Sequence, residues 1–316
     1  MKPRILVIAG PTASGKSDLA IDLALQLAGE IVCADSLTVY RGLDIGSAKP
    51  TAEQRRRVPH HLLDIREPTR PFTAAAFRHE AARAISDILQ RGKRPIVAGG
   101  SGLYLRVLLR GLTDAPGEDP ALRQKLKRWA DQEGSAALLE ELRRVDPQTA
   151  SRCHPNNLPR LLRALEVWHT AGIPLSRFHE RHGFNETPYD PLFLALDVPR
   201  ETLYRRIDQR VTTMLEAGLL TEVEGLLRAG VPADAKPLQA IGYKEVTAHL
   251  RGELTFEAMT ELIRLNTRHL AKRQITWLRR EPDVHWVAYP ENSATIAPSA
   301  AMYFQKGERP HVQGPL

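Results

Sequence analysis

The stretch that decides the fold is Arg4-Ile5-Leu6-Val7-Ile8-Ala9, followed at once by Gly10-Pro11-Thr12-Ala13-Ser14-Gly15-Lys16-Ser17. Its second part matches the phosphate-loop pattern G-x-x-x-x-G-K-[ST] at every required position, between an apolar run typical of a strand and a helical pattern. The glycines let successive backbone N–H groups curl around phosphate oxygens, Lys16 adds a point charge, and Ser17 offers a hydroxyl to Mg²⁺. The following helix points its positive N-terminal end at the same anion. We therefore predict that residues 10–17 bind a diphosphate or triphosphate.

A phosphate loop identifies a phosphate binder but not a reaction, since kinases, nucleotide hydrolases and transferases that release diphosphate can all use it. Phosphate-loop hydrolases usually have an apolar strand that ends in a magnesium-linked aspartate. The candidate strand at 95–98 ends instead in Gly99-Gly100-Ser101, and Asp64 is the only tolerable substitute in the sequence. This pattern disfavours ATP hydrolysis and favours a reaction in which the diphosphate leaves intact.

Composition limits the class of protein. A chain of 316 residues, 42% of them hydrophobic, can bury a sizeable core. No apolar run approaches 18 residues, and the expected strand at the N-terminus leaves no room for a signal peptide. Cys33 and Cys153 lack metal-ligand spacing and are expected to be reduced thiols. We therefore expect a cytoplasmic protein with no membrane partner.

Alternating strand and helix patterns fill the first part of the chain, which predicts an α/β fold: a parallel sheet of the P-loop NTPase type with helices on its faces. Ligands of such sheets gather at the carboxyl ends of the strands. The expected strands are Ile5–Ala9, Glu30–Ala34, His61–Ile65, Pro95–Ala98, Leu192–Val198 and Val284–Ala288.

The pattern changes after Gly111, where helical periodicity replaces the alternation. This predicts core segments at 1–113 and 191–290, an all-helical insertion at 114–190, and a flexible tail at 291–316, because the tail is rich in Pro, Ser, Ala and Gly without periodicity. The expected helices are Lys16–Ala28, Thr73–Gln90, Gly102–Arg110, Pro120–Gln132, Ser135–Val145, Asn157–Thr170, Arg200–Ala217, Leu219–Ala229, Gly242–Leu250 and Thr255–Arg279.

Two polar side chains end strands beside the phosphate loop. Asp35 follows the second strand, where a general base could face a substrate, although an aspartate that only caps a turn is equally consistent with the position. Ser101 places a small hydroxyl at the tip of the fourth strand, where it could also cap the next helix.

Basic residues recur at helical spacing in two places. The predicted helix 255–279 carries Arg264, Arg268 and Lys272 four residues apart, and the insertion adds Arg160 and Arg163. A single stripe of this kind is usually a solvated face. Two basic elements flanking a phosphate pocket make an RNA-sized polyanion a more plausible partner.

The chain resembles the bacterial tRNA dimethylallyltransferases (tRNA isopentenyltransferases) from about residue 4 to residue 288. The resemblance rests on these segments in combination: Gly10–Ser17; Asp35-Ser36; Tyr40-Arg41-Gly42; Asp44–Pro50; His60–Asp64; Gly99–Tyr104; Asp146-Pro147; His154-Pro155-Asn156; Arg160; Arg163–Glu166; Ile241-Gly242-Tyr243; and Ala271–Arg279.

The resemblance implies that dimethylallyl diphosphate gives its five-carbon group to N6 of the adenosine just 3′ of the anticodon, in tRNAs reading codons that begin with U. It implies a Mg²⁺ requirement, with Ser17 at the metal. Asp35 would accept the N6 proton. Lys16, Ser101 and Arg210 would stabilise the departing diphosphate. Arg205 and Arg206 compete with Arg210 for this role.

The family's RNA contacts, carried onto this sequence, imply that the anticodon stem-loop is the partner of a monomer. The residues implied are Asp35, Ser36, Leu37, Thr38, Ser101, Arg123, Pro159, Arg160, Leu161, Leu162, Arg163, Gly242, Tyr243, Lys272, Arg273, Gln274, Thr276, Trp277 and Arg279. Three positions depart from the usual pattern: Thr38 and Pro159 replace a common Gln, and Ser101 replaces a common Thr.

Three other functions are compatible with parts of this sequence. An adenylate isopentenyltransferase would share the phosphate loop and Asp35 but has little use for the arginine-lined insertion. A small-molecule or nucleoside kinase would need a γ-phosphate acceptor site with a lid-like arginine motif, which the sequence lacks. A non-enzymatic RNA-binding module would not need the phosphate loop.

Overall fold

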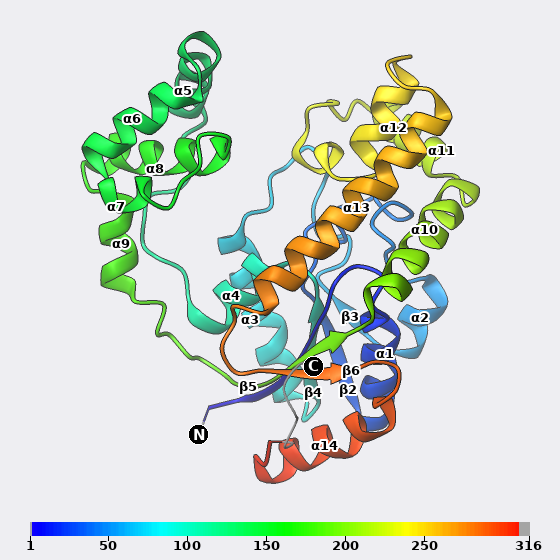
Figure 1. Ribbon diagram of the computed structural model, residues 1–316. Coiled ribbons are helices and arrows are strands. Elements are labelled where there is room, and N and C mark those ends of the chain that lie inside the picture. The colour runs from blue at the N-terminus through cyan, green and yellow to red at the C-terminus, as the bar shows by residue number, and fades with distance from the viewer. Residues whose placement is uncertain (1, 310–316) are drawn as a thin grey trace. The chain divides into compact units, whose positions relative to one another are not determined.

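The structure, a computed structural model, describes residues 2–309 and divides the chain into two compact units (Figure 1). The first unit consists of the segments before Arg110 and after Thr187, and the second is the segment Arg110–Thr187. None of the helices in the described part of the chain is both long and apolar enough to cross a bilayer.

The first unit is built on a six-stranded, entirely parallel sheet in the order β3-β2-β4-β1-β5-β6, which confirms the predicted fold class. Its central strand β1 pairs with β4 on one side and β5 on the other. The strands are β1 (Arg4–Ala9), β2 (Gly29–Cys33), β3 (His60–His61), β4 (Arg94–Gly99), β5 (Asp190–Asp197) and β6 (Val284–Ala288).

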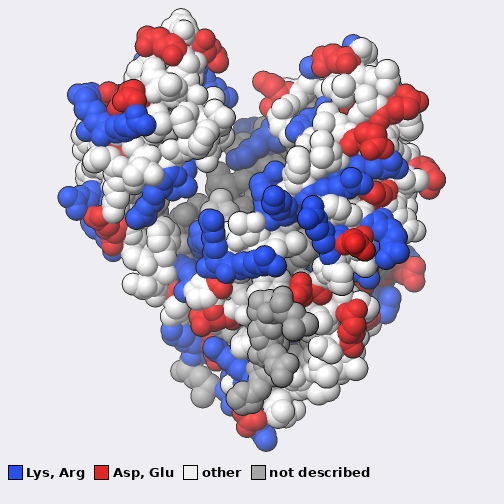
Figure 2. Space-filling model, in the orientation of Figure 1, with Lys and Arg blue, Asp and Glu red and all other residues white. Residues whose placement is uncertain are grey.

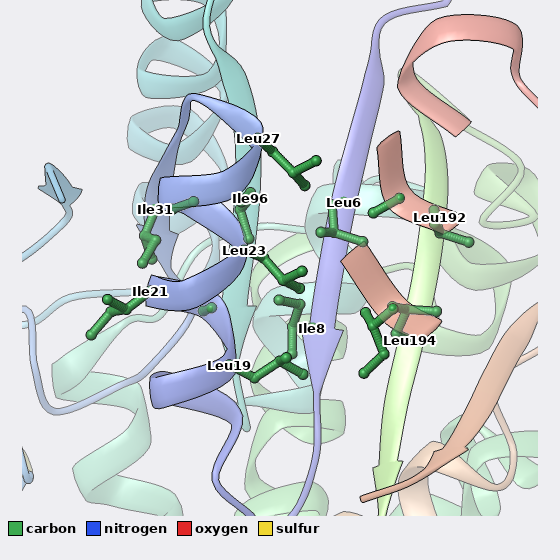
Figure 3. Close-up of a cluster of buried hydrophobic side chains, with 14 of the residues drawn as sticks. Leu6, Ile8, Leu19, Ile21, Leu23, Leu27, Ile31, Ile96, Leu192 and Leu194 are labelled. Atoms are coloured by element: carbon green, nitrogen blue, oxygen red, sulfur yellow. The ribbon is translucent and has the colours of Figure 1, made fainter. Parts of the chain in front are cut away.

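One face of this sheet is covered by α1 (Lys16–Leu27) and α14 (Ser293–Lys306). Leu6 and Ile8 point from β1 into a buried cluster with Leu19 and Leu23 of α1 (Figure 3). The same cluster includes Tyr303 of α14. At ~25 cal/mol per Å² of apolar surface, burial of such leucine and isoleucine side chains stabilises the fold by about 1.5–3 kcal/mol each.

The alternate residues of β1 point to the opposite face, as the period of two in a strand requires. Ile5 and Val7 are fully buried there, and α3 (Ala74–Gln90) packs against β2 and β4. The remaining helices of this unit are α2 (Ala52–Arg57), α4 (Gly102–Arg110), α10 (Arg200–Glu216), α11 (Leu219–Arg228), the 3₁₀ turn η1 (Lys236–Gln239), α12 (Tyr243–Leu250) and α13 (Phe256–Leu278).

Two long helices, α10 and α13, pack together at the carboxyl ends of the strands. Ile207 of α10 and Ala271 of α13 are fully buried in a small cluster that also contacts Ala13 of the phosphate loop. The two helices therefore hold the loop from outside the sheet, and they bring residues far along the chain to it.

The second unit is all-helical, and consists of α5 (Pro120–Glu133), α6 (Ser135–Val145), α7 (Pro147–Ala150), α8 (Leu158–Ala171) and α9 (Leu175–His182). Its helices share an apolar core of their own, centred on Leu138, Leu142 and Leu165. Asp146 is buried at the turn between α6 and α7, where it accepts hydrogen bonds from the N–H groups of Thr149 (3.0 Å) and Ser176 (3.0 Å). This carboxylate joins α7 to the start of α9.

The structure corrects several expected elements. The tail is not loose over residues 293–306, because Ile296, Ala300 and Tyr303 form one buried stripe of α14. Helix α9 (Leu175–His182) was not among the expected helices. The strand expected at 61–65 shrinks to His60–His61, since Leu62 and Asp64 take positive φ angles of 66° and 55° and break the ladder. The predicted tail beyond residue 309 lies outside the described residues.

Candidate active site

The phosphate loop turns sharply between β1 and α1. Ser14 N–H donates to the carbonyl of Pro11 (3.2 Å), and Gly15 takes a φ of 91° at the start of α1. A side chain at Gly15 would meet the ring of Tyr289 at 2.8 Å, so both the conformation and the close approach require glycine. The loop thus presents the N-terminus of α1, with Lys16 and Ser17, to the cavity beside it.

Charged groups meet at this loop. Burial, with Arg210 nearby, lowers the pKa of Lys16 to about 8, and the charge of Asp35 opposes this shift. Burial also lowers the pKa of Arg210, again opposed by Asp35. Two cations and one carboxylate therefore share a poorly solvated site, which suits a ligand with several negative charges.

The structure brings Arg210 rather than Arg205 into this cavity. Arg210 lines it together with Lys16 and Asp35, whereas Arg205 lies on the exposed side of α10. Arg206 points at the loop itself, since its guanidinium lies 3.5 Å from the Ser14 carbonyl. Of the three arginines, only Arg210 lines the cavity among the described residues, so it remains the predicted contact for the leaving group.

Asp35 begins a segment that forms one wall of the cavity. Its Oδ1 accepts a hydrogen bond from Leu37 N–H (2.8 Å), so part of the carboxylate caps the turn, as the plainer prediction for this residue required. Asp35, Ser36, Leu37 and Thr38 all line the cavity. The hydroxyl of Thr38 is buried and has no protein partner within residues 2–309, which leaves it available to a ligand.

Two side chains hold the rest of this wall. The buried Lys49 ammonium donates to the carbonyl of Tyr40 (2.8 Å). It also forms ion pairs with Asp44 (2.5 Å) and Asp64 (2.6 Å). Glu222 of α11 accepts hydrogen bonds from three successive backbone N–H groups, those of residues 44, 45 and 46 (2.9, 2.7 and 3.2 Å), and from the Tyr243 hydroxyl (2.7 Å). Neither anchor was predicted, since nothing in the local sequence of Glu222 marks it.

Gln274 of α13 reaches the phosphate loop. Its Oε1 accepts a hydrogen bond from Thr12 N–H (2.8 Å), and its Nε2 donates to the carbonyl of Gly100 (3.0 Å). The N–H of Thr12, predicted to face the diphosphate, is therefore taken up by a side chain. Gln274 was predicted as an RNA contact, and the structure places its amide between the loop and the end of β4.

The cavity has a volume of about 460 Å³ and lies wholly within the first unit. Its lining is polar near Lys16, Ser17 and Asp35. Apolar side chains contribute much of the remaining lining, beside polar ones such as His60, Lys244 and Thr267. The apolar residues are Ala20, Ile31, Cys33, Ala98, Val211, Met214, Ile241, Ile263 and Leu270. The cavity can therefore hold an anionic group beside an apolar one.

The other predicted RNA contacts of this unit fall into two groups. Lys272, Arg273, Thr276 and Arg279 are exposed on α13, and Gly242 lines the cavity. Figure 2 shows Lys and Arg gathered on the face over α13 and α10. The side chain of Tyr243 is fully buried and packs against Gly46, so the contact predicted at this position is one for its main chain.

Trp277 of α13 and Ser101 both lie at the start of α4. The Trp277 indole packs against Gly102, where an added Cβ would come within 2.4 Å of the ring, and the Arg106 guanidinium stacks over it at 5.9 Å. Trp277, which the resemblance implies as an RNA contact, is thus half-buried against α4. Ser101 precedes α4 and does not line the cavity, although Gly99 does.

In the helical unit the predicted contacts divide in the same way. Pro159 and Arg160 are exposed at the start of α8. The side chains of Leu161 and Leu162 are buried in the core of the unit, so the contacts predicted at these positions are ones for the main chain. Arg163 donates to the carbonyls of Pro116 (2.6 Å) and Gly117 (3.3 Å), and Arg123 pairs with Glu118 (2.6 Å).

The predicted metal site has few protein donors. No cluster of three or more His, Cys, Asp or Glu residues occurs among residues 2–309. Asp64, the substitute for a magnesium-linked aspartate, is held by Lys49 (2.6 Å) and Arg55 (2.8 Å) instead. Ser17 and Asp35 remain, and this fits Mg²⁺, which commonly takes one or two protein oxygens and completes its shell with substrate phosphates and water.

A parallel sheet whose first strand leads through this loop into a helix, with two cations at the helix start, defines the P-loop class of α/β proteins. The model of the IPP transferase family matches residues 38–281. The chain belongs to the IPP transferase family.

Relatives and solved structures agree with this assignment. The chain is 68% identical to tRNA dimethylallyltransferase 1 of Trichlorobacter lovleyi, over 96% of this chain and 100% of that protein. It is 50% identical to tRNA dimethylallyltransferase of Geobacter sulfurreducens, over 96% and 97%.

Two solved structures are similar in fold. The full-length tRNA isopentenylpyrophosphate transferase of Bacillus halodurans superposes with a TM-score of 0.72 at 36% identity, over 96% of this chain and 98% of that one. A eukaryotic dimethylallyltransferase, captured in crystallographic snapshots acting on tRNA, gives a TM-score of 0.82 at 29% identity, over 99% and 81%.

Proposed function

We propose that this protein is a tRNA dimethylallyltransferase. It transfers the dimethylallyl group of dimethylallyl diphosphate to N6 of the adenosine 3′-adjacent to the anticodon in tRNAs reading UNN codons. The observation that carries the proposal is the cavity that gathers Lys16, Ser17, Arg210 and Asp35 beside an apolar lining. That lining suits a five-carbon chain, and the cations suit its diphosphate.

In the proposed reaction, a C–N bond forms between the first carbon of the dimethylallyl group and adenosine N6. The bond from that carbon to the diphosphate oxygen breaks, and its electron pair leaves with the diphosphate. Lys16, Arg210 and the N–H groups at the start of α1 lie where this charge grows, so they stabilise the transition state more than the bound donor. The Ser17 hydroxyl would help to hold a Mg²⁺ ion, which would add further charge neutralisation of the diphosphate.

Asp35 takes the proton that N6 loses. The lone pair of this exocyclic amine is delocalised into the ring, so the amine is a weak nucleophile until its proton is accepted. Leu37 N–H holds one carboxylate oxygen of Asp35 (2.8 Å), which fixes the direction of the other. Thr38, with its unpartnered hydroxyl on the same wall, is available to the adenine edge.

The adenosine must leave its base stack to enter a cavity of this kind, at a cost of about a few kcal/mol that is smallest in a single-stranded loop. The exposed residues Lys272, Arg273 and Arg279 on α13, with Arg160 on α8, are the proposed contacts for the RNA backbone. The proposed substrate places the enzyme in the cytoplasm, where we expect it to act as a monomer.

One assay tests the proposal. The protein is incubated with Mg²⁺ and dimethylallyl diphosphate labelled in its carbon chain, in parallel with tRNA, AMP or ATP, and the label is followed. We expect label on tRNA alone, at the adenosine after the anticodon. Removal of Mg²⁺ with EDTA should abolish the transfer.

Other outcomes of the same assay would overturn the proposal. Label on AMP but not on tRNA would identify an adenylate isopentenyltransferase. Turnover of ATP without any transfer of label would identify a kinase or hydrolase.

A further inference from the structure

Gln274 joins three segments that are far apart in the sequence. It lies in α13, its Oε1 accepts a hydrogen bond from Thr12 of the phosphate loop, and its Nε2 donates to the carbonyl of Gly100 after β4. Both hydrogen bonds have ordinary lengths, 2.8 and 3.0 Å. They use the amide's acceptor and one of its two donors.

The surroundings of Gln274 are fitted to this role. An added Cβ at Gly100 would lie 2.4 Å from Gln274 Nε2, so the backbone comes close only because residue 100 is glycine. Ala13, the next residue of the phosphate loop, packs against the cluster formed by α10 and α13. The loop is thus held by one specific amide and by apolar contact beside it.

Thr12 and Gln274 also line the cavity, so the amide acts at its edge. Thr12 N–H is held in place there, and Ser14 N–H bonds to the carbonyl of Pro11 (3.2 Å). These two constraints limit the conformations of the turn before Lys16, which must otherwise find its anion-binding shape only when a ligand arrives.

We propose that Gln274 is a positioning residue for the phosphate loop, which holds the loop in its diphosphate-binding shape rather than contacting RNA. This inference rests on the proposed function only in naming dimethylallyl diphosphate as the anion. Gln274 acts through the main chain of residues 10–15 and, through Gly100, on the turn that carries Ser101.

The test measures binding of inorganic pyrophosphate and of an anticodon stem-loop RNA separately, by titration calorimetry, for the parent chain and for Gln274→Met. Methionine fills nearly the same volume but makes neither hydrogen bond. We expect the pyrophosphate affinity to fall about tenfold, the effect of losing a hydrogen-bonded pair at a partly buried site. The RNA affinity should stay within about twofold of the parent.

His269→Leu is the matched control, since His269 is exposed on the same helix and lies outside the cavity. It should leave both affinities unchanged. If Gln274→Met fails to fold, as judged by its thermal melting, Gln274→Leu decides the question. Leucine also makes neither hydrogen bond and adds no charge that would repel the anion, so pyrophosphate binding should again weaken.

A pyrophosphate affinity equal to that of the parent would overturn the proposal. This result together with weaker RNA binding would make Gln274 a direct RNA contact. In the transfer assay, a positioning role predicts a higher KM for the donor with an unchanged KM for tRNA. If the parent chain transfers nothing to tRNA, the proposed function fails, but the pyrophosphate comparison still decides the role of Gln274.

Discussion

Asp35 is the single residue on which the proposed chemistry depends. Asp35→Asn keeps the size of the side chain and an oxygen for Leu37 N–H, but it cannot accept a proton. We expect turnover to fall about 10²–10⁴-fold, the usual contribution of a general base, with tRNA affinity nearly unchanged. Single-turnover transfer measures the loss of turnover, and a filter-binding assay measures the tRNA affinity. Turnover within threefold of the parent would remove Asp35 as the base.

The lowered pKa of Lys16 predicts how the binding of the prenyl donor depends on pH. Its pKa of about 8 in the free protein means that the ammonium loses its proton as the pH rises through that value, and the anion then meets a neutral amine. Affinity for dimethylallyl diphosphate should therefore fall above pH 8. Near pH 8, binding should take up a proton, because the bound anion favours the charged form.

Calorimetry in buffers with different ionisation enthalpies measures this proton uptake. Lys16→Arg is the comparison, since a guanidinium stays charged across the range. Its affinity should be lower overall but flat between pH 7.5 and pH 9. A parent chain with no proton uptake at pH 8 would contradict the assigned pKa.

At the scale of elements, one side chain of α11 controls a wall of the cavity. Glu222→Ala leaves the N–H groups of residues 44–46 and the Tyr243 hydroxyl without their acceptor, at a cost of about 1–3 kcal/mol for each group that stays buried. We expect a lower melting temperature and faster proteolysis within residues 41–48. Glu222→Gln should retain most of the stability, because an amide oxygen can still accept.

Glu224→Ala is the control for this prediction. Glu224 lies on the same helix, is exposed, and its carboxylate forms a long ion pair with Arg228 (3.9 Å). Equal shifts in melting temperature for the two alanine variants would show that the Glu222 contacts do not stabilise the wall.

Asp146 plays a corresponding part in the helical unit. Burial alone would raise the pKa of Asp146, but hydrogen bonds from Ser176 and Thr149 outweigh it and hold the pKa below its ordinary value. Because the folded-state pKa is depressed, the carboxylate stabilises the fold above its unfolded pKa, and this contribution is lost as the pH falls through the folded pKa.

We therefore expect Asp146→Asn to lower the free energy of unfolding of the unit at pH 7 by about 1–2 kcal/mol. The difference from the parent should shrink below about pH 4. Urea unfolding at several pH values, followed by far-UV circular dichroism, gives the loss of unfolding free energy at pH 7 and its change with pH. Asp131→Asn, at an exposed position of α5, should behave like the parent at every pH.

Sequence periodicity was sufficient for most elements, because their apolar residues fall on one face. Helix 135–145 and strand 284–288 were predicted at their observed bounds. The stripe of α14 was hidden by Pro298 and by the small residues around it. The reach of Gln274 and Glu222 to loops that lie far along the chain depends on tertiary packing, to which local patterns do not respond.

The site was predicted to a similar extent. The phosphate loop and Asp35 each follow the carboxyl end of a predicted strand, and such ends meet at one edge of a parallel sheet. Residues of both line the cavity. The RNA-contact stretches were predicted as runs, and burial separates their members: Arg160 is exposed, whereas Leu161 and Tyr243 face cores. The RNA contacts were carried over as whole runs, although the apolar side chains of Leu161 and Leu162 already indicated the inward face of α8.

At the scale of the whole molecule, α14 packs residues 293–306 against the sheet. Tyr303 is fully buried in the α1 face of the core, its hydroxyl bonds to the carbonyl of Asp190, and Arg4 donates to the carbonyl of Phe304 (2.9 Å). Tyr303→Ala should lower the free energy of unfolding by about 3–5 kcal/mol, as removal of large buried side chains does.

Chemical denaturation measures this change. Met302→Ala alters the neighbouring residue, which is 44% exposed, and should change the stability by no more than about 0.5 kcal/mol. Similar losses in the two variants would mean that α14 does not contribute to the common core.

The place of the helical unit within the chain has a consequence for synthesis on the ribosome. Strand β1 is made first, but its neighbour β5 begins only at Asp190, after the segment Arg110–Thr187 has been translated. Since that segment has its own core, it can form while the nascent sheet still has an open side. The edge of β1 that pairs with β5 therefore stays open for about 180 residues, about eighty of them in the helical unit, and quick closure of that unit would shorten its exposure to other chains.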